Sequence, residues 1–415
     1  MRYLAADVGG TFTDLVLVDV DPATGAGRVH LDKVTSQATG SAAGIADGIA
    51  RITAAAGLGP ADIDLFVHGF TVGTNAFLTR NGAKVALVVT KGFRDILVIG
   101  SQSRPDLYSL TSRKPEAVVP RSRTIEVDER IDAFGNIVTP LTETEAARIA
   151  TAVAALNPQS VAVCLTFAHL DPSHERMIEA ALRRALPEVP VYLSSHVNPQ
   201  IEEYPRANTT AVAAYVGPVI DRYVRAVEAR LAGIGFKSPL RLMRSDGGAA
   251  TARAARDNPA HMGGHSHGDG LDAVDTHGGN CALLSAEVME TLSPFRVLKT
   301  ELVDGSGGAG QYRGGLGIVR DYEHLAERSV VGAYVQQTRD DTRPWGLAGG
   351  QPGGKAGMWL NPDRPNGEQL NSKVIGQVLR KGDVLRLVGA GGGGWGDPVK
   401  RDAALAKRDE LERFA

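Results

Sequence analysis

The sequence has few of the features that mark exported, membrane-bound or nucleic-acid-binding proteins. Its 415 residues include two cysteines, Cys164 and Cys281, which form no disulfide framework and fit a reducing, cytoplasmic location. The net charge of −2 gives no electrostatic attraction for nucleic acid or an anionic membrane. No apolar run approaches the roughly 20 residues that a membrane-spanning helix needs. The first three residues lead directly into a predicted strand rather than a signal peptide.

Several catalytic and nucleotide-binding signatures are also missing. The pattern GxxxxGK[ST] does not occur, which excludes a P-loop enzyme, and no Gly-x-Ser-x-Gly elbow supplies a serine nucleophile. GxGxxG occurs at 305–310 and at 389–394, but neither run opens a predicted helix, as a dinucleotide-binding fingerprint requires. We therefore predict that these glycines form structural loops where two backbones approach closely.

The chain changes character near residue 260. Before it, short apolar runs alternate with helical patterns at 36–56, 71–80, 142–156, 174–186 and 208–234, the last of which Gly217-Pro218 could interrupt. This alternation predicts an α/β fold with a mostly parallel sheet covered on both faces. A polar, glycine-rich junction follows. From residue 295 onward, β-like runs separated by glycine clusters predict a β-rich module, which ends with one helix at 402–414.

The most informative stretch is the beginning of the chain. Two apolar runs, 4–8 and 15–18, read as strands that flank Gly9-Gly10, where the backbone is free to take a positive φ. Backbone N–H groups that converge in such a turn form an anion site, and a neighbouring carboxylate can hold a magnesium-bound water. We therefore interpret the stretch as a phosphate-binding loop. The residues that line it would be Asp7, Gly9, Gly10, Thr11, Thr13 and Asp14. An ordinary β-hairpin whose glycines only serve the turn is the alternative.

Two further strand ends carry polar side chains that could face this loop. One bears His68, Thr71 and Asn75, and the other bears Asp246; both could equally be turns that cap the next helix. The junction holds a histidine- and aspartate-rich run, in which a zinc or manganese site and a solvated loop are both open interpretations. Its residues are His261, His265, His267, Asp269, Asp272, Asp275 and His277.

These motifs, in this order, resemble the hydantoinase/oxoprolinase family. Residues 1–256 are similar to the start of its A-type, ATP-hydrolysing subunit, and residues 262–400 to the C-terminal part of its B-type subunit. The A-type likeness rests on DVGGTFTD at 7–14, HGFTVGTN at 68–75, TKGFRD at 90–95, NTT at 208–210 and RSDGG at 244–248. The B-type likeness rests on DGLD at 269–272, DGSGGAGQYRGG at 304–315, PWGL at 344–347, LNP at 360–362 and the run 391–398.

The resemblance implies a function and a set of site residues. It implies an actin-like (ribonuclease H-like) α/β lobe, and an enzyme that uses ATP and Mg²⁺ to open a cyclic amide of the 5-oxoproline or hydantoin type by phosphorylating the amide oxygen. Asp7 and Asp14 would be catalytic, with Asp7 also at the metal. The nucleotide would be bound by Gly9, Gly10, Thr11, Thr13, Thr71, Asn75 and Asp246. Relatives that carboxylate acetone or acetophenone leave a carboxylase open as an alternative.

The chain also departs from the family pattern. After Gly248 neither an SGPAGG-like stretch nor a second DxGGTxxD-like loop occurs, so part of the nucleotide clamp has no counterpart. A non-catalytic remnant that binds A-type or B-type subunits, or forms a homo-oligomer, is therefore a second hypothesis. The predicted segments are an actin-like lobe (1–195), a truncated second part (196–256), a junction (257–270), a β-rich module (271–400) and a C-terminal helix (401–415).

Overall fold

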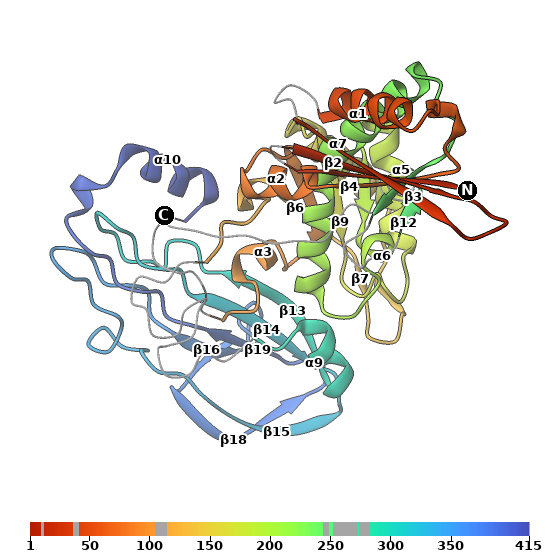
Figure 1. Cartoon of the computed structure of the whole chain (residues 1–415). Helices are drawn as coiled ribbons and strands as arrows, with labels where there is room; N and C mark the ends of the chain where they lie inside the picture. Colours follow the sequence, from red (N-terminus) through yellow and green to blue (C-terminus); the bar gives the residue numbers. More distant parts are fainter. Residues whose placement is uncertain are drawn as a thin grey trace. The chain divides into compact units, whose positions relative to one another are not determined.

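A computed structural model describes residues 1–9, 12–35, 41–103, 114–243, 249–251, 273 and 283–414. The chain forms two compact units, one from residues 1–83 and 212–263, the other from 84–211 and 264–415 (Figure 1). The division differs from the predicted segments because the chain leaves the first unit at residue 84 and re-enters it within the long helix α7, Glu203–Gly233. The predicted segment limits follow sequence likeness and stay a prediction. Both units combine helices with sheets, which confirms the predicted α/β class.

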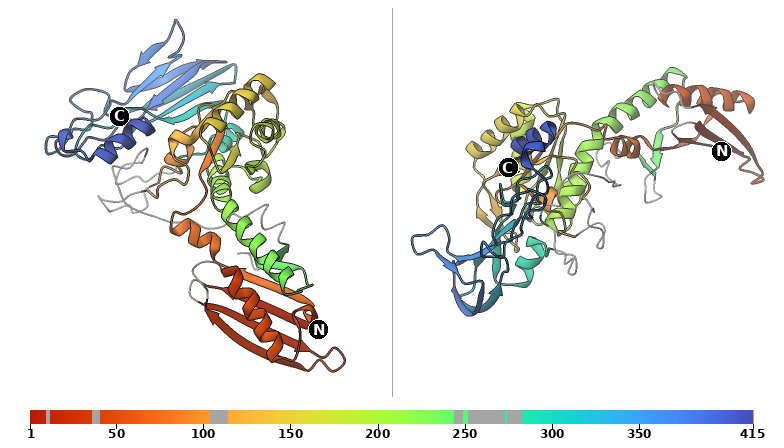
Figure 2. Two further views of the ribbon diagram at one scale, coloured as in Figure 1. Left: turned by 90° about the horizontal axis from the view of Figure 1, so that it is seen from above. Right: turned by 90° about the vertical axis from the view of Figure 1, so that its left-hand side faces the viewer.

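The first unit is built on a six-stranded sheet with the order β12-β11-β4-β1-β2-β3. Strands β1, β2 and β3 form an antiparallel meander, whereas β4 and β11 run parallel to β1. Helix α1, Ser41–Ala55, crosses one face of this sheet, as the left view of Figure 2 shows. The remaining elements are β1 Arg2–Val8, β2 Phe12–Val20, β3 Gly27–Thr35, a 3₁₀ turn Pro60–Asp62, β4 Leu65–Phe70, α2 Val72–Leu78, β11 Leu240–Met243 and β12 Ala249–Thr251.

The two faces of this sheet differ in what packs on them. One face buries alternate residues of β1 and β2 (Leu4, Ala6, Leu15 and Leu17) beneath α1, and an ideal Cβ on Gly48 of α1 would lie 2.7 Å from Leu15 Cδ1. Small residues in α1 therefore let the helix approach closely. The opposite face leaves several apolar side chains exposed. They are Tyr3, Phe12, Val29, Leu31 and Met243.

The second unit begins with a parallel α/β layer. Its sheet has the order β10-β9-β5-β6, and α4 and α5 pack against it around a buried aliphatic core. Helix α4 begins as predicted, with the Thr142 side chain accepting a hydrogen bond from the Glu145 N–H at 3.1 Å. The elements are β5 Val85–Thr90, α3 Ile96–Ile99, a 3₁₀ turn Arg121–Arg123, β6 Thr124–Val127, β7 Arg130–Ile131, β8 Ile137–Thr139, α4 Glu143–Ala155, β9 Ser160–Cys164, α5 Ser173–Ala185, β10 Val191–Leu193 and α6 Ser194–Val197.

The same unit contains the β-rich part of the chain. An antiparallel sheet has the order β13-β14-β19-β16-β17, and β15 pairs with β18 in a separate ribbon. Its elements are α9 Ala286–Leu292, β13 Phe295–Leu302, β14 Ile318–His324, β15 Arg328–Tyr334, β16 Gly357–Leu360, β17 Glu368–Leu370, β18 Lys373–Arg380, β19 Val384–Val388, a 3₁₀ turn Pro398–Lys400 and α10 Ala403–Glu412. The predicted strands and the final helix are confirmed.

Glycine-rich segments lie side by side next to this sheet. Residues 306–315, 344–354 and 389–396 exchange backbone hydrogen bonds, such as Gly308 N–H to Gly392 O at 2.8 Å. A Cβ at Gly393 would lie only 1.9 Å from the carbonyl oxygen of Trp345, and one at Gly391 equally close to that of Ser306. No side chain fits at such a separation. The prediction that both GxGxxG runs are structural loops is therefore confirmed.

Helix α7 is continuous, so the predicted interruption at Gly217-Pro218 is not found. A proline removes one N–H from the helical hydrogen bonds, which favours a break. Around Pro218, however, the helix is packed on several sides, because residues 211–216 are all nearly buried. Tertiary packing therefore outweighs the local preference. No helix among the described residues is long and apolar enough to cross a membrane.

Candidate functional site

Asp7 and Asp14 lie next to each other at the carboxyl end of β1. They are directly opposed residues of the β1–β2 hairpin, so their side chains lie on the same, open face of the sheet. Asp14 forms an ion pair with Lys33 of β3 at 2.8 Å, and both side chains are more than half exposed. Among the described residues, no hydrogen bond or ion pair engages the Asp7 carboxylate. The sheet therefore presents one unpaired and one paired carboxylate side by side.

A glycine makes room beside Asp7, and a second one begins the turn that follows it. Gly69 of β4 is the cross-strand neighbour of Asp7, and an ideal Cβ on it would lie 3.0 Å from Asp7 Oδ1. The bare backbone at this position lets the carboxylate lie over β4. At the end of the strand, the Gly9 N–H donates to the carbonyl oxygen of Phe12 at 3.0 Å, which begins the predicted turn. The predicted hairpin is thus confirmed by the pairing of β1 with β2.

Thr13 differs from expectation. It is completely buried and lies on the helix-covered face of the sheet, opposite Val8, whereas Asp14 lies on the open face. Successive residues of a strand point to opposite faces, so neighbouring Thr13 and Asp14 cannot both line one concavity. The expectation that the Thr13 hydroxyl shares a concavity with Asp7 and Asp14 is therefore corrected. Gly10, Thr11 and Asp246 lie outside the described residues, as do Cys281 and the histidine-rich run 261–277.

Thr71 and Asn75 meet at the same strand end as the carboxylates. The Thr71 hydroxyl donates to the backbone carbonyl of Val8 at 3.4 Å, and Asn75 Nδ2 donates to Thr71 Oγ1 at 3.3 Å. Both residues are exposed. The bond to Val8 brings the first turn of α2 to the end of β1, one residue from Asp7. The structure therefore places two of the predicted polar residues beside the predicted loop.

His68 supports this strand end from the buried face. Its Nδ1 lies 3.1 Å from the carbonyl oxygen of Ala6, and its Nε2 lies 2.8 Å from the hydroxyl of Tyr223 in α7. Burial lowers the pKa of His68 to about 4, so the ring is neutral at pH 7. Nδ1–H must then donate to Ala6, and Nε2 accepts from Tyr223. This pair ties β1, β4 and α7 together directly beneath Asp7.

Sequence reasoning missed the role of Lys33, because nothing in the motif points to it. Lys33 pairs across the strands with Asp14, and its Nζ also lies 5.3 Å from the ring centre of Phe12. Counting back along the β2–β3 hairpin from its turn would have placed a cation opposite Asp14. The site therefore combines two carboxylates, one ammonium group, a hydroxyl and an amide.

This donor set suits a magnesium-bound phosphate. Mg²⁺ prefers one or two carboxylates together with waters and substrate phosphates, rather than a complete protein cage. Asp7 and Asp14 meet that requirement, and Lys33 can neutralise phosphate charge. No cluster of three or more metal-ligating side chains occurs among the described residues. A magnesium ion would therefore be held here by Asp7 or Asp14 together with the nucleotide phosphates, and would neutralise the charge of those phosphates.

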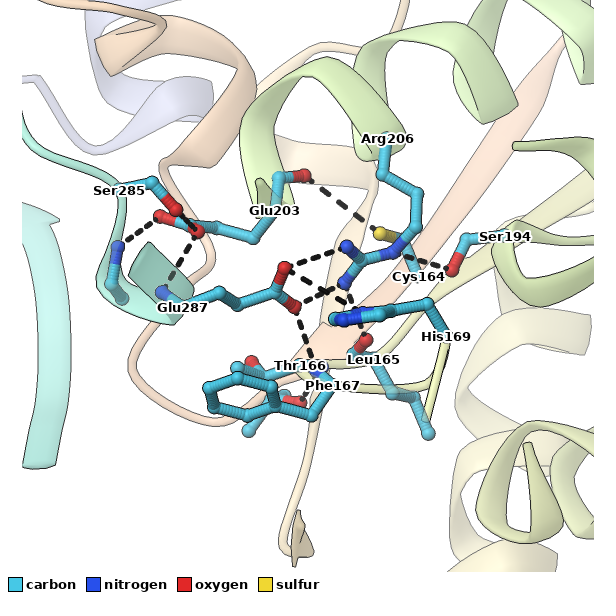
Figure 3. A network of polar contacts seen from close by, with 12 residues as sticks. Cys164, Leu165, Thr166, Phe167, His169, Ser194, Glu203, Arg206, Ser285 and Glu287 are labelled. Carbon is cyan, nitrogen blue, oxygen red and sulfur yellow. Dashed lines mark hydrogen bonds and ion pairs between the residues drawn. The ribbon is translucent and has the colours of Figure 1, made fainter. Parts of the chain in front are cut away.

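The second unit contains a buried polar network that could be mistaken for a catalytic centre (Figure 3). Arg206 of α7 and Glu287 of α9 form a bidentate ion pair in which both side chains are fully buried. Arg206 also donates to the carbonyl oxygens of Gln200 at 2.8 Å and Leu165 at 3.0 Å. The Phe167 N–H donates to Glu287 at 2.7 Å. Because protein groups satisfy both members of the pair, the network has a structural role.

Glu203 and Cys164, which lie beside the ion pair, also have structural roles. Glu203 accepts a hydrogen bond from the Ala286 N–H at 2.8 Å and another from the Ser285 hydroxyl, and so caps the start of α9. Burial raises the pKa of the Cys164 thiol to about 12, which leaves it protonated and unreactive at neutral pH. The network therefore joins the β-rich part of the chain to the α/β layer.

Two family patterns match the chain and overlap between residues 142 and 186. Residues 3–186 match the family pattern described as the hydantoinase/oxoprolinase N-terminal region, and residues 142–398 match the one described as hydantoinase B/oxoprolinase. Caprolactamase subunit alpha of Pseudomonas jessenii is 35% identical over 260 residues, which are 61% of this chain and 37% of that protein. The 5-oxoprolinase 1 of Arabidopsis thaliana is 28% identical over 379 residues, which are 83% of this chain and 28% of that protein.

Two solved structures are similar to this chain. The crystal structure of the ATP-dependent caprolactamase from Pseudomonas jessenii superposes with a TM-score of 0.55 at 34% identity, over 60% of this chain and 36% of that one. A nucleotide-free acetone carboxylase, at 20% identity and the same TM-score of 0.55, covers 92% of this chain and 48% of that one, which shows likeness of fold alone. This chain spans well under half the length of the two curated relatives. It belongs to the hydantoinase/oxoprolinase family.

Proposed function

We propose that the first unit binds Mg-ATP and that the chain acts as an ATP-dependent hydrolase of cyclic amides. The observation that carries the proposal is the strand end at which Asp7 and Asp14 lie side by side next to Thr71 and Asn75. Family membership supports the use of ATP, because the caprolactamase relative is named as ATP-dependent. The Asp7 carboxylate would hold a magnesium ion, which would neutralise phosphate charge, and Lys33 would pair with a phosphate oxygen.

The remaining residues take supporting roles. The Gly10 N–H and the Thr11 hydroxyl contact the phosphates, and Gly9 shapes the turn that presents them. Asn75 contacts the nucleotide, and Asp246, which follows β11 in the sequence, is a further candidate. Thr13 supports the loop from the buried face rather than by direct contact. His68 keeps β1 and β4 in register beneath the site.

The reaction we propose activates a poor electrophile. The amide oxygen bonds to the γ-phosphorus of ATP while the bond to the bridging oxygen breaks and ADP leaves. Water then adds to the activated carbon, and the C–N bond breaks as the nitrogen takes up a proton. A second water releases phosphate, so that ATP, two waters and the ring yield ADP, phosphate and the open amino acid. The substrate we propose is a lactam of the 5-oxoproline or hydantoin type.

One observation favours a second candidate, a subunit-binding protein. The open face of the first sheet exposes Tyr3, Val29 and Leu31, yet three of its strands run parallel, an arrangement that is usually covered on both faces. A partner subunit from the same family, or a second copy of the chain, would cover it. In that case the chain need not turn over a substrate. A carboxylase of the acetone or acetophenone type is supported by likeness of fold to an acetone carboxylase and by sequence likeness to a subunit of an acetophenone carboxylase.

The deciding experiment is calorimetric titration of the full chain with Mg-ATP. We expect binding in the wild type and its loss in Asp7→Ala. Asp19→Ala is the matched control, because Asp19 lies on the same hairpin but opposite Arg2, about 17 Å along β2 from Asp14. ADP release is then measured with and without 5-oxoproline, hydantoin and caprolactam. Binding without lactam-stimulated ADP release would favour the subunit-binding candidate. If the folded chain does not bind Mg-ATP, both ATP binding and ATP-dependent hydrolysis are excluded.

A further inference from the structure

Arg320 lies in the buried face of the β-rich sheet, in the second unit. It alternates along β14 with Ile318 and Tyr322, which pack into two separate apolar clusters, one with Ile99 of α3 and the other with Phe93. Strand residues two apart share a face, so Arg320 lies between the two clusters. Figure 1 shows α3 and α9 beside β13 and β14 at this place. Only 5% of Arg320 is exposed.

The guanidinium group of Arg320 has no anionic partner among the described residues. Its Nε and Nη2 are buried and make no hydrogen bond with the described residues. The guanidinium carbon lies over the ring of Tyr322, 5.5 Å from the ring centre. The cross-strand neighbour of Arg320 on β13 is Thr300, whose buried hydroxyl oxygen likewise lacks a partner. Two adjacent side chains thus hold three polar atoms without partners, all in one buried place.

A second arginine of the same sheet shows how the fold treats a paired guanidinium. Arg386 of β19 donates to Asp321 at 2.7 Å and to Asp363 at 2.8 Å. Arginine keeps its charge at any accessible pH, so it cannot escape burial by losing a proton. An uncompensated buried charge strongly destabilises a fold. The contrast between Arg386 and Arg320 therefore indicates that a negative group from outside the described residues compensates Arg320.

We propose that Arg320 and Thr300 form a binding site for a small oxyanion, a carboxylate or a phosphate. The Nε–H and Nη2–H edge of a guanidinium matches two oxygens of such a group, and the threonine hydroxyl donates a third hydrogen bond. The limited exposure restricts the ligand to a small ion rather than a nucleotide. The site lies in the second unit and does not depend on the proposed nucleotide site of the first.

The test is thermal unfolding of the full chain in phosphate, sulfate or acetate, compared with chloride at the same ionic strength. A ligand that binds only the folded state raises Tm, and we expect a rise of about 2 °C or more with at least one of the three anions. Phosphate and acetate distinguish the two ligand chemistries. Arg320→Met should abolish the rise, and Thr300→Val should reduce it. The rise should persist in Asp7→Ala, which separates this site from a phosphate site in the first unit.

The sign of the mutational effect in chloride gives a second readout. Arg320→Met removes an unpaired buried charge, so it should leave Tm unchanged or raise it when no oxyanion is present. Arg386→Met is the matched control; it removes a paired arginine of the same sheet and should lower Tm in every buffer. The proposal would be overturned if no anion shifts the wild-type Tm and Arg320→Met lowers it in chloride. That outcome would mean that another part of the protein compensates Arg320.

Discussion

The ion pair between Arg206 and Glu287 offers the sharpest test of how the second unit is held together. Glu287→Gln keeps the shape of the side chain but removes the negative charge, which leaves the fully buried Arg206 with only neutral acceptors. Breaking a buried pair from one side costs about 3–5 kcal/mol. The Phe167 N–H also loses a charged acceptor, which adds about 1 kcal/mol. We expect a total loss of about 4–6 kcal/mol in the free energy of unfolding.

The assay is urea denaturation of the full chain, followed by far-ultraviolet circular dichroism and by tryptophan fluorescence. Glu179→Gln is the matched control, because Glu179 pairs with Arg183 on the surface of α5 and should contribute less than about 1 kcal/mol. In the double variant Arg206→Met/Glu287→Met, both charges are replaced by apolar groups. This variant should recover most of the stability lost in Glu287→Gln.

Two results would refute this reasoning. If Glu287→Gln shifts the urea midpoint no more than Glu179→Gln does, Arg206 is not a desolvated charge in solution. If the double variant is less stable than Glu287→Gln alone, the pair contributes a net attraction that exceeds its desolvation cost. We would then have to drop the inference from its complete burial, which is that the pair adds little net stability although losing one partner is costly.

Three further predictions follow from other parts of the chain. Burial lowers the pKa of His68, so the unfolded state binds more protons than the folded state between about pH 4 and 6.5. The free energy of unfolding should be constant above pH 6.5 and fall by about 2 kcal/mol at pH 5. Urea midpoints measured against pH should show this dependence in the wild type and not in His68→Phe. Gly393→Ala would place a methyl group 1.9 Å from the carbonyl oxygen of Trp345, so we expect insoluble or unfolded protein by circular dichroism. Gly233→Ala, in open space at the end of α7, should stay folded. Thr142→Ala removes the cap of α4 and should cost about 1 kcal/mol in thermal unfolding, with Thr142→Ser as the conservative control.

Local elements could be predicted because neighbouring residues determine them. Thr142 and Glu145 mark the start of α4, and Asp402 marks the start of α10, since a capping side chain reaches only its own first turn. The side-by-side placement of Asp7 and Asp14 also follows from a short hairpin. Thr13 was misplaced because the strand period of two was not applied to it.

The sequence by itself therefore determined the family, the α/β class, the first hairpin and the close backbone packing of the glycine runs. Only the tertiary structure decided that α7 continues through Pro218, that Lys33 pairs with Asp14 and that Glu287 meets Arg206 from 81 residues away. It also decided that Arg320 is buried with no hydrogen-bond partner for its Nε and Nη2 among the described residues. Those contacts depend on which strands pair and which helix faces pack together. Such choices are made by burial over the whole unit, and no local pattern of side chains encodes them.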